Sequence, residues 1–388
     1  MFFAKNRNLE KYVDTLFPVT VACLNDSHPS KINGTIGSLY DEDNKIVAYK
    51  SVFDSLRSLD NGIIAKYSSG SFGNNDFNET IVKFVLEDRV NNYRNLPTPG
   101  GTGAIALGIN VCLDSGDTIV IPDIAWGNYK NIAIENNLKV RTYNPYEVEK
   151  ILDIVKDLDK ICIVINSPCQ NPCGLSYSYE EWKKLLDSLK SLNKEVIIVN
   201  DVAYIDYSSS DNYKDYFSLF NDLSDNMLVF IAYSCSKTFS YYGLRVGALF
   251  MIHNNDEFLD LLLNQCARRA RAVFSSVNNA GMTSIADVIN NHLEEFNKEK
   301  AYYVDLIKKR ADIFVNECKE NDIDIYPYND GFFVTLKYED NKRRDEVFKK
   351  FVDDHIYFIK VNKGIRVGIC SIPLEKIQGL AKRLKTLL

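Results

Sequence analysis

Lys237 is the residue of this sequence with the clearest capacity for chemistry. It follows the apolar run 227–232, which has the composition of a buried strand, and it stands between the hydroxyl side chains of Ser236 and Thr238. Arg245 follows a few residues later. A lysine amine forms Schiff bases with carbonyl compounds, and hydroxyl groups together with a guanidinium suit a phosphate. These groups at the end of one strand therefore predict pyridoxal 5'-phosphate as a cofactor.

Short apolar runs are expected to form the strands that position these groups. They are rich in Ile and Val and show little polar alternation, as strands buried on both faces do. The runs are 118–122, 161–165, 196–199, 227–232 and 246–252. Helical patterns separate them, and one opens with a capping box in which Ser178 and Glu181 each satisfy a free backbone donor. Alternating strands and helices predict a mostly parallel sheet covered on both faces.

Polar or aromatic side chains follow four of these runs. In open parallel sheets, ligands bind beyond the carboxyl ends of the strands. Each such residue alone could be a turn former, a helix cap or a core residue. Together, at successive strand ends, they predict a binding site made of Trp126, Asn171, Asp201, Tyr204, Ser234 and Lys237.

A glycine-rich segment, 99–104, precedes the apolar helix pattern 104–113. Glycines before a helix let backbone N–H groups approach an anion, and the helix dipole favours negative charge there. The segment also matches the dinucleotide fingerprint loosely, with Asp123 near the acidic position. That fingerprint must follow a strand, and 95–99 is too rich in proline for a central one. A nicotinamide cofactor is therefore disfavoured, and no Gly-Lys-Ser/Thr completes a phosphate-binding P-loop.

Composition limits the function classes further. The chain has 388 residues, 46% of them hydrophobic, which suffices for a large core and for two domains. A net charge of -6 gives no basic surface for nucleic acid. No apolar stretch approaches the ~20 residues of a membrane span, and residues 1–10 lack the apolar core of a signal peptide, so a cytoplasmic protein is expected. The nine scattered cysteines are interpreted as reduced structural thiols, and no metal site is predicted.

Beyond Asn254 the sequence changes to long helical stretches rich in Lys, Glu and Leu. Two pieces typical of strands, 331–338 and 364–369, and a final helix from Pro373 follow. These features predict a second, smaller domain. We expect the N-terminal segment 1–45 to contribute to it, 46–275 to form the large cofactor-binding domain, and 276–388 to supply a linking helix and the rest of the small domain.

These motifs resemble those of the fold type I pyridoxal-phosphate-dependent aminotransferases, in the class I group with the aspartate and aromatic aminotransferases. The most specific feature is the spacing from Lys237 to Arg245. The resemblance runs nearly end to end and also covers 32–40, 99–104, 126–128, 171–174, 201–204 and 365–367. It implies an α/β fold, in which a large domain holds a mostly parallel sheet between helices and a smaller domain is α+β. It also implies an enzyme that transfers an amino group from an amino acid to a 2-oxo acid, working as a homodimer with shared active sites.

The resemblance assigns roles to the residues around the cofactor ring. Lys237 would hold the cofactor as a Schiff base and then carry the proton between substrate and cofactor. Asp201 would pair with the pyridine nitrogen. Tyr204 and Asn171 would hydrogen-bond the phenolic oxygen of the cofactor, and Trp126 would stack on the ring.

A second set of residues is implied for the phosphate. Gly101, Thr102, Ser234 and Arg245 would hold it, with the arginine supplying a two-pronged contact that lysine cannot copy. Tyr67 occupies the place of a family tyrosine that reaches the phosphate of the neighbouring subunit. The implied active enzyme is therefore a dimer.

Substrate contacts are implied as well. Arg366 would bind the α-carboxylate of the substrate through a planar two-point contact. Gly37 would leave room beside that carboxylate. Trp126 and Asn171 would contact the substrate as well as the cofactor.

The sequence departs from the family pattern at one place. Relatives specific for dicarboxylates carry a second arginine, contributed by the other subunit, and here the matching position is Thr283. No arginine lies between Ala272 and Arg310. Arg268, Arg269 and Arg271, which lie nearby in the sequence, have the spacing of a solvated helix face. An aromatic or other neutral amino acid is therefore the expected donor.

Two other functions are compatible with parts of this pattern. A carbon-sulfur lyase would use the same cofactor for β-elimination, because the outcome depends on the leaving group of the substrate. A non-catalytic, cofactor-binding regulatory protein is less expected. Such a protein would need a DNA-binding extension or degraded catalytic positions, and Lys237, Asp201 and Arg366 are all present.

Overall fold

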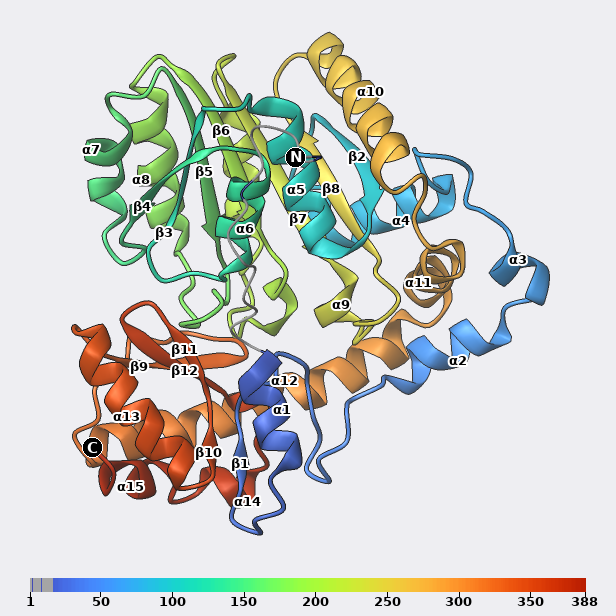
Figure 1. Ribbon diagram of the computed structural model, residues 1–388. Coiled ribbons are helices and arrows are strands. Elements are labelled where there is room, and N and C mark those ends of the chain that lie inside the picture. The colour runs from blue at the N-terminus through green and yellow to red at the C-terminus, as the bar shows by residue number, and fades with distance from the viewer. Residues whose placement is uncertain (1, 3–7, 9–16) are drawn as a thin grey trace.

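The computed structural model describes residues 2, 8 and 17–388, so part of the predicted N-terminal segment lies outside the described residues. A seven-stranded sheet forms its centre (Figure 1). The strands run in the order β2-β8-β7-β6-β5-β3-β4. Their bounds are β2 Tyr93–Thr98, β3 Thr118–Pro122, β4 Lys139–Tyr143, β5 Lys160–Asn166, β6 Glu195–Asp201, β7 Met227–Ser234 and β8 Gly247–Ile252. Only β8 runs in the direction opposite to the other six strands, so the expected mostly parallel sheet is confirmed.

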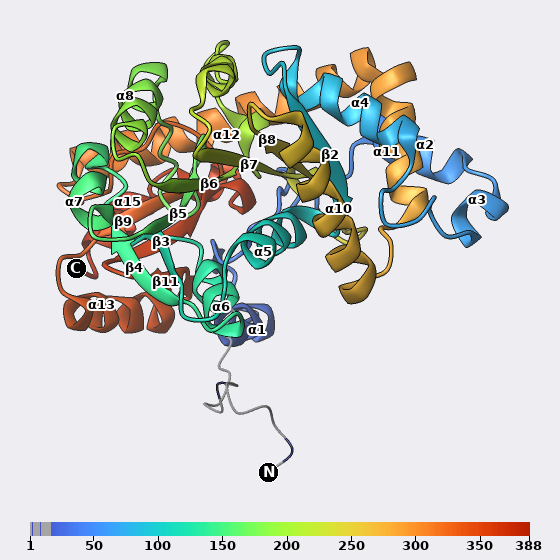
Figure 2. The same cartoon turned by 90° about the horizontal axis from the view of Figure 1, so that it is seen from above.

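Helices cover both faces of this sheet (Figure 2). Because side chains alternate along a strand, β6 sends Ile197 and Val199 into one apolar core and Val196 and Ile198 into the other. The first core is closed by α5 Gly100–Cys112, α6 Asn128–Glu135 and α10 Asp256–Val273. The second is closed by α4 Asn75–Leu86, α7 Ile151–Val155, α8 Tyr179–Lys190, α11 Asn279–Asn291 and α12 Leu293–Glu320. This double burial explains why the strands are apolar at nearly every position.

The sequence-based predictions of these elements hold with two corrections, and the edge strand β4 was not predicted. The five predicted strands correspond to β3, β5, β6, β7 and β8, and the capping box of Ser178 and Glu181 opens α8. The proline-rich segment before the glycines does form a strand, β2, which lies at the edge of the sheet. An edge strand tolerates the missing N–H of Pro97. The proline-rich segment is therefore not a central strand, as predicted, but the glycine-rich segment does follow an edge strand.

The C-terminal part of the chain builds a separate, smaller set of strands (Figure 1). A three-stranded antiparallel sheet has the order β11-β12-β9, and β1 pairs with β10 in parallel. The bounds are β1 Ile32–Asn33, β9 Phe333–Lys337, β10 Ile356–Tyr357, β11 Ile359–Val361 and β12 Gly364–Gly368. Helices α1 Phe17–Asn25, α13 Asn341–Asp353, α14 Leu374–Ile377 and α15 Leu380–Lys385 accompany them. The proposed domain bounds at 45 and 275 stay a prediction.

The predicted final helix is interrupted, and this is the second correction. It divides into α14 and α15 at Gly379, whose φ of +77° is left-handed. Helices α2 Lys50–Ser58 and α3 Asn61–Ala65 extend away from the central sheet (Figure 1). Among the described residues, none of the helices combines the length and the apolar content needed to span a bilayer.

Candidate active site

A cavity of about 160 Å³ lies at the carboxyl ends of the parallel strands. Nine of the residues predicted from the sequence line it. They come from the last residues of β6 and β7 and from the loops and helices that follow β2, β3, β5, β6 and β7. They are Gly101, Thr102, Trp126, Asn171, Asp201, Tyr204, Ser234, Lys237 and Arg245. The parallel sheet brings these residues together because its strands all end at the same edge.

Lys237 lies in the short helix α9, Cys235–Thr238, which begins where β7 ends. Ser234 caps this helix by accepting a hydrogen bond from the backbone N–H of Ser236. The Lys237 Nζ donates to the carbonyl of Gly37 at 2.6 Å and lies 4.8 Å from the centre of the Tyr242 ring. Burial lowers the pKa of this amine to about 8, since a charged ammonium is poorly solvated there. Burial therefore raises the fraction of neutral, nucleophilic amine at a given pH.

Asp201 ends β6 and is 5% exposed. Its Oδ2 accepts a hydrogen bond from the Tyr129 hydroxyl at 2.5 Å, and its Oδ1 accepts from the backbone N–H of Ala203 at 3.0 Å. Burial raises the pKa of the carboxyl to about 6, while these two donors oppose the rise. The group is thus mostly ionised at neutral pH despite its burial.

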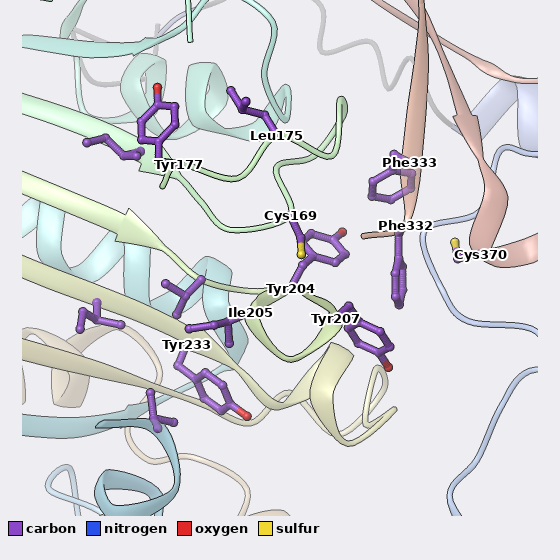
Figure 3. Packing of buried hydrophobic residues seen from close by; sticks show 14 of the residues in the cluster. Cys169, Leu175, Tyr177, Tyr204, Ile205, Tyr207, Tyr233, Phe332, Phe333 and Cys370 are labelled. Atoms are coloured by element: carbon purple, nitrogen blue, oxygen red, sulfur yellow. The ribbon is translucent and has the colours of Figure 1, made fainter. Parts of the chain in front are cut away.

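Tyr204 faces the cavity from the loop after β6. Its ring packs edge-on against Phe332, which directly precedes β9, and Phe333, the first residue of β9 (Figure 3). The Lys237 Nζ lies 5.3 Å from the centre of the same ring. Burial raises the pKa of the phenol, so its hydroxyl stays protonated and can donate a hydrogen bond. The phenol is therefore oriented by packing between the two sheets.

One end of the cavity has the groups that bind a phosphate. Helix α5 begins there, and its N-terminal backbone N–H groups favour an anion. Arg245 donates from Nη1 to the Ser236 Oγ at 2.9 Å and to the carbonyl of Tyr242 at 2.9 Å. A Cβ atom on Gly100 would lie 2.5 Å from the Arg245 Nη2. The glycine thus makes room for the guanidinium beside the helix end.

Arg366 and Gly37, which do not line the cavity, lie next to residues that do. The Arg366 Nη1 donates to the Asn171 Oδ1 at 3.2 Å, and its Nη2 donates to the carbonyl of Thr35 at 2.9 Å. Its guanidinium carbon lies 4.3 Å from the centre of the Phe333 ring. The Arg366 Nε is buried and has no hydrogen-bond partner among the described residues. An unpaired donor of this kind indicates a site for an acidic group.

Tyr67 is the predicted site residue that this single chain does not bring to the cavity. Its side chain is 86% exposed and follows α3. Thr283, at the position of the missing arginine, lies half-buried on α11. Arg268, Arg269 and Arg271 are exposed on α10, in keeping with a solvated helix face.

The structure adds residues that the sequence reasoning missed. Ile105, Asn166, Ala203 and Tyr242 also line the cavity, as does Ser236, which the sequence singled out only as a hydroxyl next to Lys237. Asn166 ends β5, a position that the strand-end argument could have found. Tyr129 does not line the cavity but touches two residues that do, and its place one helical turn after Trp126 was an available signal.

These groups fit pyridoxal phosphate. An amine with a lowered pKa, an ionised buried carboxylate and an anion site at a helix end match its aldehyde, its pyridine nitrogen and its phosphate. Lys237, Asp201 and Arg245 would hold these three parts respectively. The cofactor ring would lie between them, against Trp126 and Tyr204.

Comparison with known proteins identifies a family. A family model described as aminotransferase class I and II matches residues 29–384. A cytoplasmic aspartate aminotransferase of Dictyostelium discoideum is 28% identical over 294 residues, which are 72% of this chain and 66% of that protein. An aspartate aminotransferase of Escherichia coli is 24% identical over 314 residues, 76% of this chain and 78% of the relative.

Solved structures agree in fold. An aminotransferase from Anaerococcus prevotii superposes with a TM-score of 0.93 at 30% identity, covering 100% of this chain and 99% of that one. An aromatic-amino-acid aminotransferase from Burkholderia pseudomallei, covalently bound to pyridoxal phosphate, gives a TM-score of 0.82 at 20% identity and covers 100% of both chains. These names favour amino-group transfer over the lyase alternative.

Proposed function

The chain belongs to the class I and II aminotransferases, which are pyridoxal-phosphate-dependent enzymes, and on that premise we propose that it moves an amino group from an aromatic or other neutral amino acid to a 2-oxo acid. The observation that carries the choice of donor is the absence of arginine between Ala272 and Arg310. A distal carboxylate on the substrate needs a cationic partner, because a buried unpaired charge is costly. Aspartate would find no arginine on this segment.

Lys237 is proposed as the anchor of the cofactor and the carrier of the proton. When bound, pyridoxal phosphate supplies a carbonyl that condenses with amines and a ring that withdraws electrons from the substrate α-carbon. With a pKa of about 8, roughly one lysine in ten carries a free amine at neutral pH. At the ordinary value of 10.5 the fraction would be about one in three thousand. Burial thus raises the reactive fraction about 300-fold.

Asp201, Tyr204 and Asn171 are proposed to hold the ring. An Asp201 carboxylate with a pKa of about 6 is roughly nine-tenths ionised at neutral pH and can pair with a protonated pyridine nitrogen. Tyr204 and Asn171 are proposed to donate to the phenolic oxygen. Trp126 would cover one face of the ring.

Gly101, Thr102, Ser234 and Arg245 are proposed to bind the phosphate, with Tyr67 arriving from a second subunit. The exposure of Tyr67 on an extension next to α3 supports this part of the proposal. The enzyme would then be a homodimer with shared sites. A cytoplasmic location is also proposed, supported by the name of the Dictyostelium relative.

Arg366 is proposed to bind the α-carboxylate of the substrate. Its buried, unpaired Nε supports this role, because a carboxylate that reaches it removes an unsatisfied donor. The substrate would approach between Arg366 and the carbonyl groups of Thr35 and Gly37, which now accept from Arg366 and Lys237. Gly37 has no Cβ atom to occupy space there; such an atom would lie 3.5 Å from the Phe333 ring, an ordinary contact distance.

The test is a half-reaction without any 2-oxo acid. The protein is loaded with pyridoxal phosphate and mixed with single amino acids, and the absorption of the cofactor is followed. Tyrosine or phenylalanine should convert the cofactor to its amino form with a higher kcat/KM than aspartate, and Lys237→Ala should not turn over. A clearly higher kcat/KM for aspartate would contradict the donor assignment. Release of pyruvate and ammonia from cysteine, with no conversion by other amino acids, would favour the lyase.

A gain-of-function variant sharpens the donor test. Thr283→Arg should raise kcat/KM for aspartate at least 10-fold by supplying the missing cation. Thr386→Arg adds the same charge at an exposed position in the last turn of the chain and should change nothing. Equal effects of both variants would count against a role for position 283.

A further inference from the structure

Tyr129 lies beneath the candidate site and touches two residues proposed to face the cofactor. Its phenol is fully buried on α6, and its hydroxyl donates to the Asp201 Oδ2 at 2.5 Å. Its ring meets the Trp126 ring at an angle of 90° with 5.3 Å between the ring centres. We propose that Tyr129 is a positioning residue of the aminotransferase site, which keeps the Asp201 carboxylate ionised and oriented and supports the Trp126 ring.

The direction of this hydrogen bond is fixed by chemistry. A carboxylate only accepts, so the phenol must be the donor. Burial raises the pKa of the Tyr129 phenol well above its ordinary value, so the hydroxyl keeps its proton throughout the working range of pH. Within the described part of the chain, this hydroxyl makes no hydrogen bond other than the one to Asp201. The donor is therefore dedicated to that carboxylate.

The other groups around Asp201 cannot take over this task. The Ala203 N–H is a neutral backbone donor and occupies the other carboxylate oxygen. Lys237 acts on the carboxylate through its charge alone, and it is proposed to be consumed by the cofactor. Neither Tyr143 nor Tyr204 hydrogen-bonds the Asp201 carboxylate within the described residues: the Tyr143 hydroxyl donates to the carbonyl of Val164, and Tyr204 acts on Asp201 through charge alone. Tyr129 is thus the one side chain among the described residues that directly hydrogen-bonds the carboxylate.

A purely structural role for Tyr129 is the alternative to be tested. Tyr143 provides the matched comparison, because it is equally buried and its hydroxyl donates to a backbone carbonyl, that of Val164, at 2.9 Å. Removing either hydroxyl leaves a buried acceptor without its donor. Only removal of the Tyr129 hydroxyl takes a hydrogen-bond donor from a buried carboxylate. The free-energy cost is larger for a charged acceptor than for a neutral carbonyl.

The experiment measures the titration of Asp201 in the full-length, cofactor-free protein. Infrared difference spectra against Asp201→Asn identify the carbonyl band of the protonated carboxyl. The wild type should titrate near pH 6. Y129F should titrate about one to two pH units higher, because a hydrogen bond to a charged group has been lost. Y143F should titrate with the wild type.

The loaded enzyme gives a second readout. With the preferred amino acid, Y129F should lower kcat with little change in KM, and the acid limb of its pH profile should move upward with the Asp201 titration. In an Asp201→Asn background, removing the Tyr129 hydroxyl should cause no further loss. An Asp201 titration in Y129F that coincides with the wild type, or one that Y143F shifts equally, overturns the proposal.

A double substitution tests the proposal even if Y129F does not fold. If Y129F fails to fold because a carboxylate is left uncompensated, Y129F/D201N should fold, since no charge remains to be buried. If the double variant also fails to fold, the Tyr129 phenol is needed for the fold itself and the proposal is wrong. The role of Asp201 at the cofactor rests on the proposed function, but its titration is measured without any catalytic turnover. If Y129F shifts the Asp201 titration but the protein shows no transaminase activity, the proposed function is rejected while the effect of Tyr129 on Asp201 stands.

Discussion

Replacing Lys237 by methionine should stabilise the cofactor-free protein at neutral pH. Burial lowers the pKa of the amine from 10.5 to about 8, which corresponds to about 3 kcal/mol of unfavourable free energy for the charged form. Methionine has a similar length and no charge. It also loses the hydrogen bond to the Gly37 carbonyl, worth about 1 kcal/mol. The side chain is not fully excluded from solvent, so a net gain of about 2 kcal/mol is an upper bound.

The pH dependence of this gain identifies its cause. The folded state releases the Lys237 proton near pH 8, whereas the unfolded chain keeps it until about pH 10.5. Between these values the unfolded state binds more protons, so the stability of the wild type rises with pH. Lys237→Met has no such group. Its advantage should be complete below pH 8 and should disappear as the pH approaches 10.5.

The assay compares thermal unfolding of the full-length, cofactor-free proteins at pH 7 and at pH 10, taking the difference between variant and wild type at each pH. Other groups that titrate in this range cancel in the difference. Lys298→Met is the control, because Lys298 is 73% exposed on α12 and pairs with Glu294. It should change stability by less than about 0.5 kcal/mol at either pH. A Lys237→Met protein that is less stable than the wild type at pH 7, or a gain that does not depend on pH, would refute the reasoning.

Three further predictions concern the cofactor and the substrate. Arg366→Lys should raise KM for the amino acid about 10- to 100-fold with little loss of cofactor affinity, because a planar two-point contact becomes a point charge; equal losses of both would contradict the assignment. Gly100→Ala should weaken pyridoxal phosphate binding, because the added Cβ atom would displace the Arg245 guanidinium and an alanine is strained at a φ of +73°. Gly116→Ala is the control: its φ of +97° gives the same backbone strain, but its Cβ atom would meet open space, so the affinity for the cofactor should not change. The rate of cofactor loading should rise with pH and level off above about pH 8, as the free amine of Lys237 accumulates; a rate that keeps rising to pH 10 would place that pKa elsewhere.

The sequence alone was sufficient for five of the seven strands of the large sheet and for the residues at their ends. Strands buried on both faces are apolar throughout, so runs such as 161–165 and 227–232 predicted β5 and β7 without further information. Lys237 and Asp201 then had to share one edge of the sheet, because parallel strands end on the same side. The proline-rich strand β2 escaped this reasoning, since its place at the sheet edge is decided by its partner β8.

Only the tertiary structure decided which distant groups meet. The carbonyls of Thr35 and Gly37 accept from Arg366 and Lys237 although 331 and 200 residues separate the partners. The hydrogen bond from Tyr129 to Asp201 joins α6 to β6 in the same way. Local sequence patterns indicate the periodicity of an element and where a strand ends, because both depend on short-range sterics and burial. Contacts between far segments, and the pKa values that they set, depend on how whole layers pack, and no local pattern carries that information.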